Sequence, residues 1–170
     1  MPGPANPRLP AVFRRRPRWY NRPDMAKRFT LAEAQGLIPT VDRLLHEAVD
    51  AKGEYQHAEQ AIHEFTEHVM MMGGVMVDRD RALNARARRD DAASRLRECI
   101  EAVLETGCLL KDLDIGLVDF PTLFRGVEVY LCWKLGESGI TFWHSVDEGF
   151  RGRKPIDQDF LDHHQGDRPQ

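Results

Sequence analysis

Residues 41–72 read VDRLLHEAVDAKGEYQHAEQAIHEFTEHVMMM, and their apolar and small side chains recur at alternating steps of three and four residues. This stripe consists of Val41, Leu44, Ala48, Ala51, Tyr55, Ala58, Ile62, Phe65, Val69 and Met72. A heptad stripe sustained over more than four repeats predicts a long helix that packs side by side with another helix. At a rise of about 1.5 Å per residue, this helix should extend about 50 Å.

The flanking residues indicate where this helix and a partner helix begin and end. Thr30 and Glu33 have the spacing of a capping box, which predicts a helix start at Thr30. Pro39 then either begins a new helix or kinks a continuous one. A glycine pair ends the stripe, and Asp78 is placed to cap a second helix that Gly107 stops.

Two such helices joined by a short loop predict an antiparallel hairpin over residues 30–107. A hairpin of this length cannot bury both apolar stripes alone, so we expect a homodimer with a coiled-coil-like arrangement of four helices, although the C-terminal sheet could cover part of the stripes. The first helix also carries four histidines, none at an apolar heptad position: His46, His57, His63 and His68. We therefore expect a solvated helix face there and no metal site.

The residues that follow change to strict alternation, which predicts a small C-terminal antiparallel sheet over residues 108–156. About three strands are expected, at 115–120, 126–135 and 140–144. The predicted fold class is therefore α+β, with a long antiparallel two-helix hairpin followed by this sheet. Residues 157–170 have the composition of a polar tail.

The alternation across the last predicted hairpin fixes the place of His144. Matching the apolar positions pairs Leu135 with Ile140, so His144 lies on the core face, opposite Leu131. Cys132 then lies on the other face. This register argues against a Cys132–His144 nucleophilic dyad, unless the loop length is misjudged by one residue.

His144 is the strongest candidate for a functional side chain, because acidic residues are expected around it. Asp119 lies across the sheet, and Asp147 and Glu148 follow in the sequence. A histidine with two or three carboxylates can ligate a divalent metal ion or act as a general base. The candidate metal ligands are Asp119, His144 and Glu148, and the candidate catalytic residues are His144 and Glu148. The alternative is a histidine held structurally by one carboxylate.

The composition and the cysteine content limit the size of the domain, its relation to the membrane and its compartment. At 170 residues and 42% hydrophobic, the chain can form one packed domain, which we place at residues 29–156. No apolar run approaches the ~18 residues of a membrane span. Three cysteines without a CxxC pair indicate a reducing compartment, so we expect a cytoplasmic protein.

The first 28 residues differ in character from the rest. Residues 1–28 carry eight arginines and lysines against Asp24 alone, together with six of the ten prolines. Such a segment predicts a disordered basic extension. It is either an upstream extension of a chain that starts at Met25, or an arm that contacts nucleic acid or anionic lipid. We expect no nucleic-acid contact from the rest of the chain, which is acidic.

Four motifs in the C-terminal half carry a family resemblance: KDLDIGLVDFP at 111–121, VYLCWKLGE at 129–137, FWH at 142–144 and GFRGRKP at 149–155. Together they resemble a family of short bacterial proteins catalogued only as a domain of unknown function. The resemblance extends over residues 29–156 and implies no known activity. It implies that the family signature includes Asp112, Asp119, Trp133, Glu137, His144 and Arg153.

Two functions follow from these observations. Arg151 and Arg153 lie beside glycines, where guanidinium groups and exposed amides can hold a phosphate or carboxylate or neutralise acidic loops. With Trp133, they are the candidate ligand-binding residues. The first function is a homodimeric binding or interaction protein with an acidic pocket at His144. The alternative is a small metal-dependent hydrolase that uses His144 and nearby carboxylates.

Overall fold

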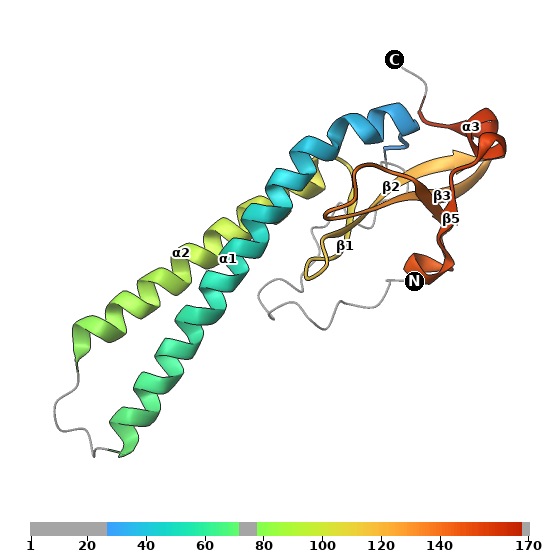
Figure 1. The fold of residues 1–170 in the computed structure, drawn as a ribbon. Coiled ribbons are helices and arrows are strands. Elements are labelled where there is room, and N and C mark those ends of the chain that lie inside the picture. The colour runs from blue at the N-terminus through green and yellow to red at the C-terminus, as the bar shows by residue number, and fades with distance from the viewer. Residues whose placement is uncertain (1–26, 72–77, 168–170) are drawn as a thin grey trace.

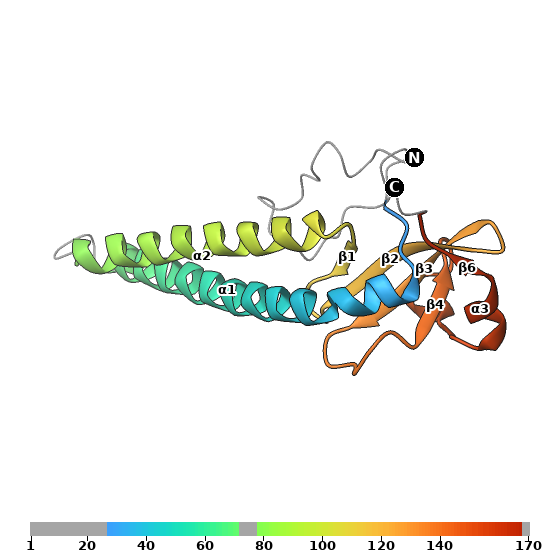
Figure 2. The same ribbon diagram turned by 90° about the horizontal axis from the view of Figure 1, so that it is seen from above.

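The computed structural model describes residues 27–71 and 78–167. Two long helices form an arm, and a small sheet is packed against one end of it (Figures 1 and 2). The elements in chain order are α1 (Leu31–Met71), α2 (Arg79–Glu105), β1 (Leu109–Asp112), β2 (Leu117–Phe124), β3 (Val127–Lys134), β4 (Phe142–Ser145), η2 (Gly149–Gly152), β5 (Lys154–Pro155), α3 (Gln158–His163) and β6 (His164–Gln165). The predicted α+β class is confirmed.

The helix ends follow the predicted capping signals. The Thr30 amide donates to Glu33 Oε2 at 2.8 Å, and the Glu33 amide donates to Thr30 Oγ1 at 3.2 Å, which is a complete capping box. Asp78 caps α2 by accepting from the Arg81 amide at 3.0 Å. Gly107 follows α2 with a φ of 93°, a left-handed conformation that favours glycine.

Pro39 lies inside α1, so the continuous helix is the correct one of the two alternatives. A proline in a helix interior removes one backbone hydrogen bond and costs about 3 kcal/mol. Burial of Ile38 and Val41, on either side of it, offsets that cost because both side chains pack in the core.

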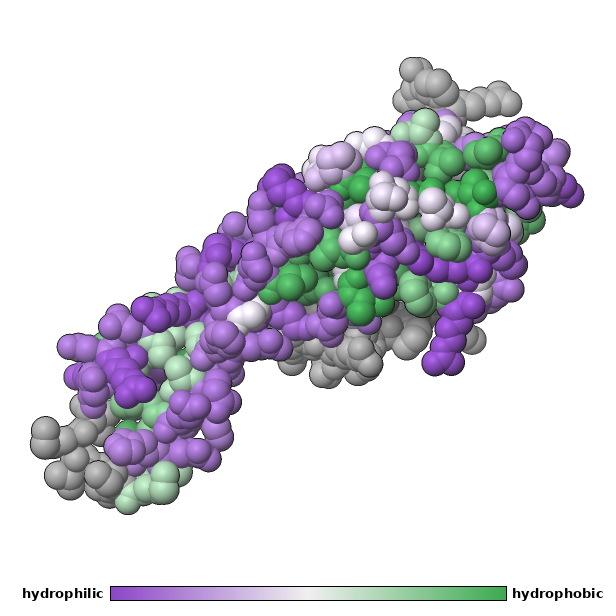
Figure 3. Space-filling model, in the orientation of Figure 1, coloured by the Kyte–Doolittle hydropathy of each residue, from purple (hydrophilic) through white to green (hydrophobic). Residues whose placement is uncertain are grey.

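The heptad stripe of α1 is buried most completely in the half of the helix nearest the sheet. Val41, Ala48 and Ala51 are at most 1% exposed, whereas Phe65 and Val69, further along the arm, are only partly buried. Near the far end Met70, Met71 and Leu83 are 75%, 79% and 53% exposed. Figure 3 shows the same change, from apolar surface over the sheet to a largely hydrophilic arm. No helix in the described residues is apolar over a length that would cross a membrane.

The sheet has six strands rather than about three, and all pairs are antiparallel. Its order is β1-β2-β3-β4-β5, and β6 pairs with β2. The long central hairpin β2–β3 turns at Arg125 and Gly126, with φ of 52° and 78°. Two consecutive positive φ angles are those of a type I′ turn, which suits the twist of a hairpin.

One face of the sheet packs on the base of the arm. Val118 pairs with Trp133 and Phe120 with Leu131, and all four side chains are buried. Phe29, which precedes α1, meets Phe120 edge to face at 5.4 Å between ring centroids. This apolar face directs the intervening residues of β2 and β3 to the opposite face of the sheet.

The segment predicted as a polar tail instead folds onto the sheet. Asp157 caps α3 by accepting from the Phe160 amide at 2.9 Å, and the Phe160 side chain is fully buried. Strand β6 then pairs with β2, and His164 Nε2 accepts from the Leu31 amide at 3.2 Å. The prediction failed because a single buried aromatic residue supplies the contact, and the segment's average composition is polar. The predicted disorder of the basic extension concerns residues that lie outside the described part, apart from Lys27 and Arg28.

Candidate functional site: a buried aspartate, cysteine and histidine

The predicted register of the β3–β4 hairpin is wrong by one residue. Tyr130 pairs with His144 and Cys132 with Phe142, so Leu131 faces Trp143 and not His144. The reason is that Ile140 is not paired with Leu135. It donates its amide to Gln35 Oε1 of α1 at 2.9 Å, and its side chain is buried in the core.

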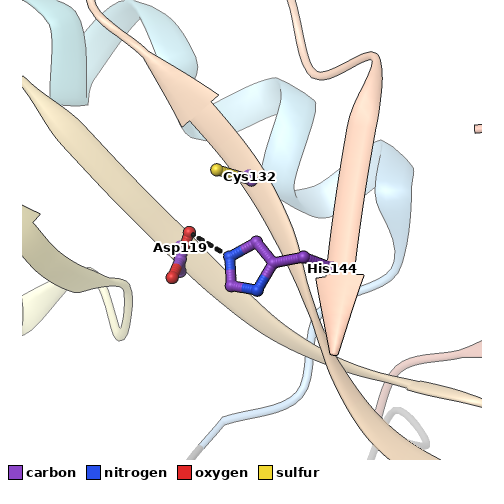
Figure 4. A group of neighbouring side chains, drawn as sticks. All are labelled: Asp119, Cys132 and His144. Atoms are coloured by element: carbon purple, nitrogen blue, oxygen red, sulfur yellow. Dashed lines mark hydrogen bonds and ion pairs between the residues drawn. The ribbon is translucent and has the colours of Figure 1, made fainter. Parts of the chain in front are cut away.

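The corrected register brings His144 to the same face of the sheet as Asp119 and Cys132. Asp119 and Cys132 are direct cross-strand partners in β2 and β3, and His144 extends from β4 beside them (Figure 4). The three side chains are nearly inaccessible, at 1%, 0% and 3% exposed. They lie on the face opposite Leu131 and the helical core, so the predicted placement of His144 on the core face is wrong, although the side chain is buried and its contact with Asp119 is present.

The imidazole of His144 is held through both nitrogens. Nε2 lies 3.2 Å from Asp119 Oδ1, and Nδ1 lies 2.8 Å from the Ser145 carbonyl oxygen. A carbonyl and a carboxylate both only accept, so both ring nitrogens can donate at once when the ring is an imidazolium. Burial by itself would lower the pKa of His144, but the hydrogen bonds to Asp119 and Ser145 outweigh it, and the pKa lies above its ordinary value.

Asp119 also has a cationic neighbour. Its Oδ2 lies 3.7 Å from Lys111 Nζ, and this ammonium sits 4.7 Å from the centroid of the Tyr130 ring. The Tyr130 ring in turn meets the His144 ring edge to face at 5.6 Å. The carboxylate is therefore compensated by positive charge on two sides, as a buried charge requires.

Cys132 contacts an arginine on its other side. Arg153 Nε donates to Cys132 Sγ at 3.2 Å, and the terminal nitrogens of Arg153 donate to the two oxygens of Glu137 at 2.6 and 3.0 Å. The guanidinium lies against the rings of Phe142 and Phe150, at 5.0 and 4.5 Å from their centroids. Arg153 is thus anchored by a bidentate ion pair while its Nε–H points at sulfur.

This geometry changes the argument about a Cys132–His144 nucleophilic dyad. Cys132 and His144 do share a face, so the register argument against a dyad is wrong. However, burial raises the pKa of the Cys132 thiol to about 12, and the Asp119 carboxylate acts in the same direction. A thiol with this pKa is protonated at neutral pH and is a poor nucleophile.

The other predicted site residues lie elsewhere. Glu148 is exposed, and hydrogen bonds from Lys154 and Ser145 lower its pKa to about 2. Arg151 is exposed on η2, and Trp133 is buried in the core on the helix-facing side. In the predicted set of metal ligands, Cys132 therefore takes the place of Glu148.

The helix histidines form no such cluster. His46, His57, His63 and His68 are all exposed, as predicted. His46 and His63 lie beside the acidic residues Asp42 and Glu67 on their own helix. Within residues 27–71 and 78–167, one group of three or more candidate ligands has its ligand atoms within 4.8 Å of one another, namely Asp119, Cys132 and His144.

Those three residues offer donor groups of the kinds that metal ions bind in proteins. Zinc in proteins binds thiolate, imidazole and carboxylate groups, at about 2.0–2.3 Å. Tetrahedral geometry then separates neighbouring N and O ligand atoms by about 3.4 Å, close to the 3.2 Å between His144 Nε2 and Asp119 Oδ1. The Nδ1–H of His144 bonds a backbone carbonyl, which is how histidine ligands are commonly oriented.

The fold and the site define a class of protein: a helical arm with a small antiparallel sheet that buries an aspartate, a cysteine and a histidine together. Comparison of the sequence with known families assigns the chain to one of them. The profile of a family described as "Uncharacterized conserved protein (DUF2203)" matches residues 27–156, and the chain belongs to this family. The predicted membership in a domain-of-unknown-function family is confirmed. No curated protein and no solved structure matches the chain.

Proposed function

We propose that this protein binds one transition-metal ion, of the zinc class, through Asp119, Cys132 and His144. The observation that carries the proposal is the convergence of three different donor groups on one buried point, with ligand atoms within 4.8 Å. Burial of a carboxylate, a thiol and an imidazolium is costly unless they are paired. A metal ion would take the place of the Nε2 proton of His144 and the thiol proton of Cys132 and bind all three groups at once.

The donor set selects among metals. A thiolate and an imidazole favour zinc or a similar borderline-soft ion, whereas magnesium and calcium prefer oxygen ligands. Binding would release the Nε2 proton of His144 and the thiol proton of Cys132, because a ligand must present a free electron pair. The affinity should therefore increase with pH.

Three protein ligands leave one tetrahedral position, which catalytic zinc sites use for water. A metal-dependent hydrolase is therefore the second candidate function. The three side chains are at most 3% exposed, which favours a binding or structural role of the metal over turnover of a bulky substrate. Hydrolysis would also require a substrate to reach the metal, whereas metal binding alone does not.

Elemental analysis of the full-length protein, prepared without a histidine tag, tests the proposal. We expect close to one equivalent of zinc in the wild-type protein after zinc loading and gel filtration. Cys132→Ser and His144→Gln should lose most of that metal, because each removes one of three ligands. Cys99→Ser is the matched control, since Cys99 lies on α2 away from the cluster, and it should retain the metal.

Two results would contradict metal binding at this site. The first is a wild-type protein that holds no zinc under these conditions. The second is a Cys132→Ser variant that folds and holds as much zinc as the Cys99→Ser control.

We also propose that the arm forms a homodimer, as its heptad stripe predicts. A groove of about 260 Å³ between the far ends of α1 and α2 is lined by Ile62, Phe65, Thr66, Val69, Met70, Ala82 and Arg86. The contiguous apolar side chains there are only partly covered within one chain. A second copy placed against this groove would bury them in a coiled-coil-like bundle.

Light scattering on the full chain tests the dimer. We expect twice the mass of one chain for the wild-type protein and a lower mass for Phe65→Glu, which places a charge in the groove. Val127→Glu is the control, because Val127 is 66% exposed at the start of β3, and its mass should not change. A wild-type monomer at micromolar concentration would exclude the dimer.

A cytoplasmic location is part of the same proposal. The three cysteines, Cys99, Cys108 and Cys132, are all free thiols, which supports a reducing compartment. A nucleic-acid role of the basic extension stays a prediction, because residues 1–26 lie outside the described part of the chain.

A further inference from the structure

We infer that Arg153 is a positioning residue for the metal site, which holds the sulfur of Cys132 as a thiolate ligand through a directed N–H···S hydrogen bond. This inference rests on the proposed metal binding. It adds two residues to the site, Arg153 and Glu137, which would support the metal ligands without contacting the metal.

The direct observation is the hydrogen bond from Arg153 Nε to Cys132 Sγ, at 3.2 Å. A neutral thiol sulfur is only a weak acceptor, whereas a thiolate is a strong acceptor for a charged donor. The contact is shielded from water, since the Arg153 side chain is 12% exposed and Cys132 is fully buried. A cationic N–H fixed on a buried sulfur is therefore suited to the metal-bound, deprotonated form of that sulfur.

The arginine is prevented from turning away. Both oxygens of Glu137 accept from its terminal nitrogens, and Glu137 Oε2 also accepts from the Lys134 amide at 2.8 Å. The rings of Phe142 and Phe150 lie against the guanidinium. The planar guanidinium thus holds Glu137 with its two terminal nitrogens and the sulfur with its Nε–H, a geometry that a lysine ammonium cannot reproduce.

Arg153 acts on the site through the direction of its N–H and not through its charge. Because Glu137 neutralises Arg153, the pair adds no net charge beside the metal ligands. Its contribution is then the placement of one N–H. This distinguishes Arg153 from Lys111, whose ammonium faces the Asp119 carboxylate and lowers the net negative charge of the site.

The experiment compares Arg153→Lys with wild type in the full-length protein, using zinc competition and the absorption of the cobalt(II) form. We expect zinc affinity to fall about 10- to 100-fold, the range measured for second-sphere partners. Loss of the N–H···S bond should raise the energy of the sulfur lone pairs. The thiolate-to-cobalt charge-transfer band should therefore shift to lower energy.

Arg151→Lys is the matched control, because Arg151 is exposed on the adjacent η2 helix, and it should change neither quantity. If wild type binds no metal, the proposed function fails. If wild type binds but Arg153→Lys shows unchanged affinity, or lower affinity with an unshifted band, the inference is overturned while the metal site stands. Should Arg153→Lys fail to fold, the double variant Arg153→Met with Glu137→Gln decides by the same criteria, since it removes the N–H from the sulfur and leaves the net charge beside the site unchanged.

Discussion

Phe160→Ala should lower the free energy of unfolding by about 3–5 kcal/mol, the usual cost of truncating a fully buried phenylalanine. The ring has no exposed surface and stacks against Phe124 and Trp143, each at 5.1 Å between centroids, and against His164 at 5.4 Å. The cavity would be bounded by β2, β4 and β6, so the loss should also loosen the pairing of β6 with β2.

Chemical unfolding followed by circular dichroism measures this effect. Leu161→Ala is the control, because Leu161 is the next residue and is 42% exposed, and we expect a change of at most about 0.5 kcal/mol. Equal, small effects of the two substitutions would show that residues 157–167 are not part of the cooperative fold.

The arm could be predicted from the sequence because its signals are local. The Thr30–Glu33 capping box, the Asp78 cap and the heptad stripe each depend on residues within a few positions of one another. Strand β6 and helix α3 could not be found in this way, since they depend on Phe160 filling a space between distant strands.

Half of the candidate site could also be predicted. The contact between His144 and Asp119 is present as expected, but Cys132 was assigned to the wrong face and Glu148 to the wrong place. A one-residue error in register moves every side chain of a strand to the other face. The contact from Ile140 to Gln35 sets that register, and no local pattern in the strands shows it.

One signal in the sequence could have found Cys132. Gly126 is a turn signal between the two apolar stretches, and a two-residue turn at Arg125 and Gly126 pairs Phe124 with Val127. Continuing the pairing away from the turn, one residue at a time on each strand, places Asp119 directly opposite Cys132. The long β2–β3 hairpin was therefore a safer guide to the site than the shorter hairpin that follows it.

Asp119→Asn should destabilise the metal-free protein by roughly 3 kcal/mol near pH 5.5, because it removes one partner of a buried ion pair. In the wild-type protein, the pKa of His144 is raised above its ordinary value of about 6.5. The pair therefore contributes stability that is fully present below about pH 6.5 and is lost as the pH rises through the raised pKa. In the variant, the hydrogen bond to the Ser145 carbonyl remains but no carboxylate compensates a buried imidazolium, so burial should lower the pKa of His144 instead. The stability of the variant should then rise with pH over the range in which that of the wild type falls.

Unfolding by denaturant in the presence of a chelator, at a series of pH values from 5.5 to about 9, separates this effect from a packing defect. A lost ion pair predicts a stability difference that is largest at the acidic end and shrinks as His144 becomes neutral in both proteins. A packing defect predicts a difference that does not change with pH. Glu148→Gln removes an exposed carboxylate from the turn between β4 and η2, so it controls for the change in net charge and should show no such convergence. Convergence in Asp119→Asn alone would assign the pH dependence to the Asp119–His144 pair, whereas a constant difference would mean that His144 is not an imidazolium in the folded protein.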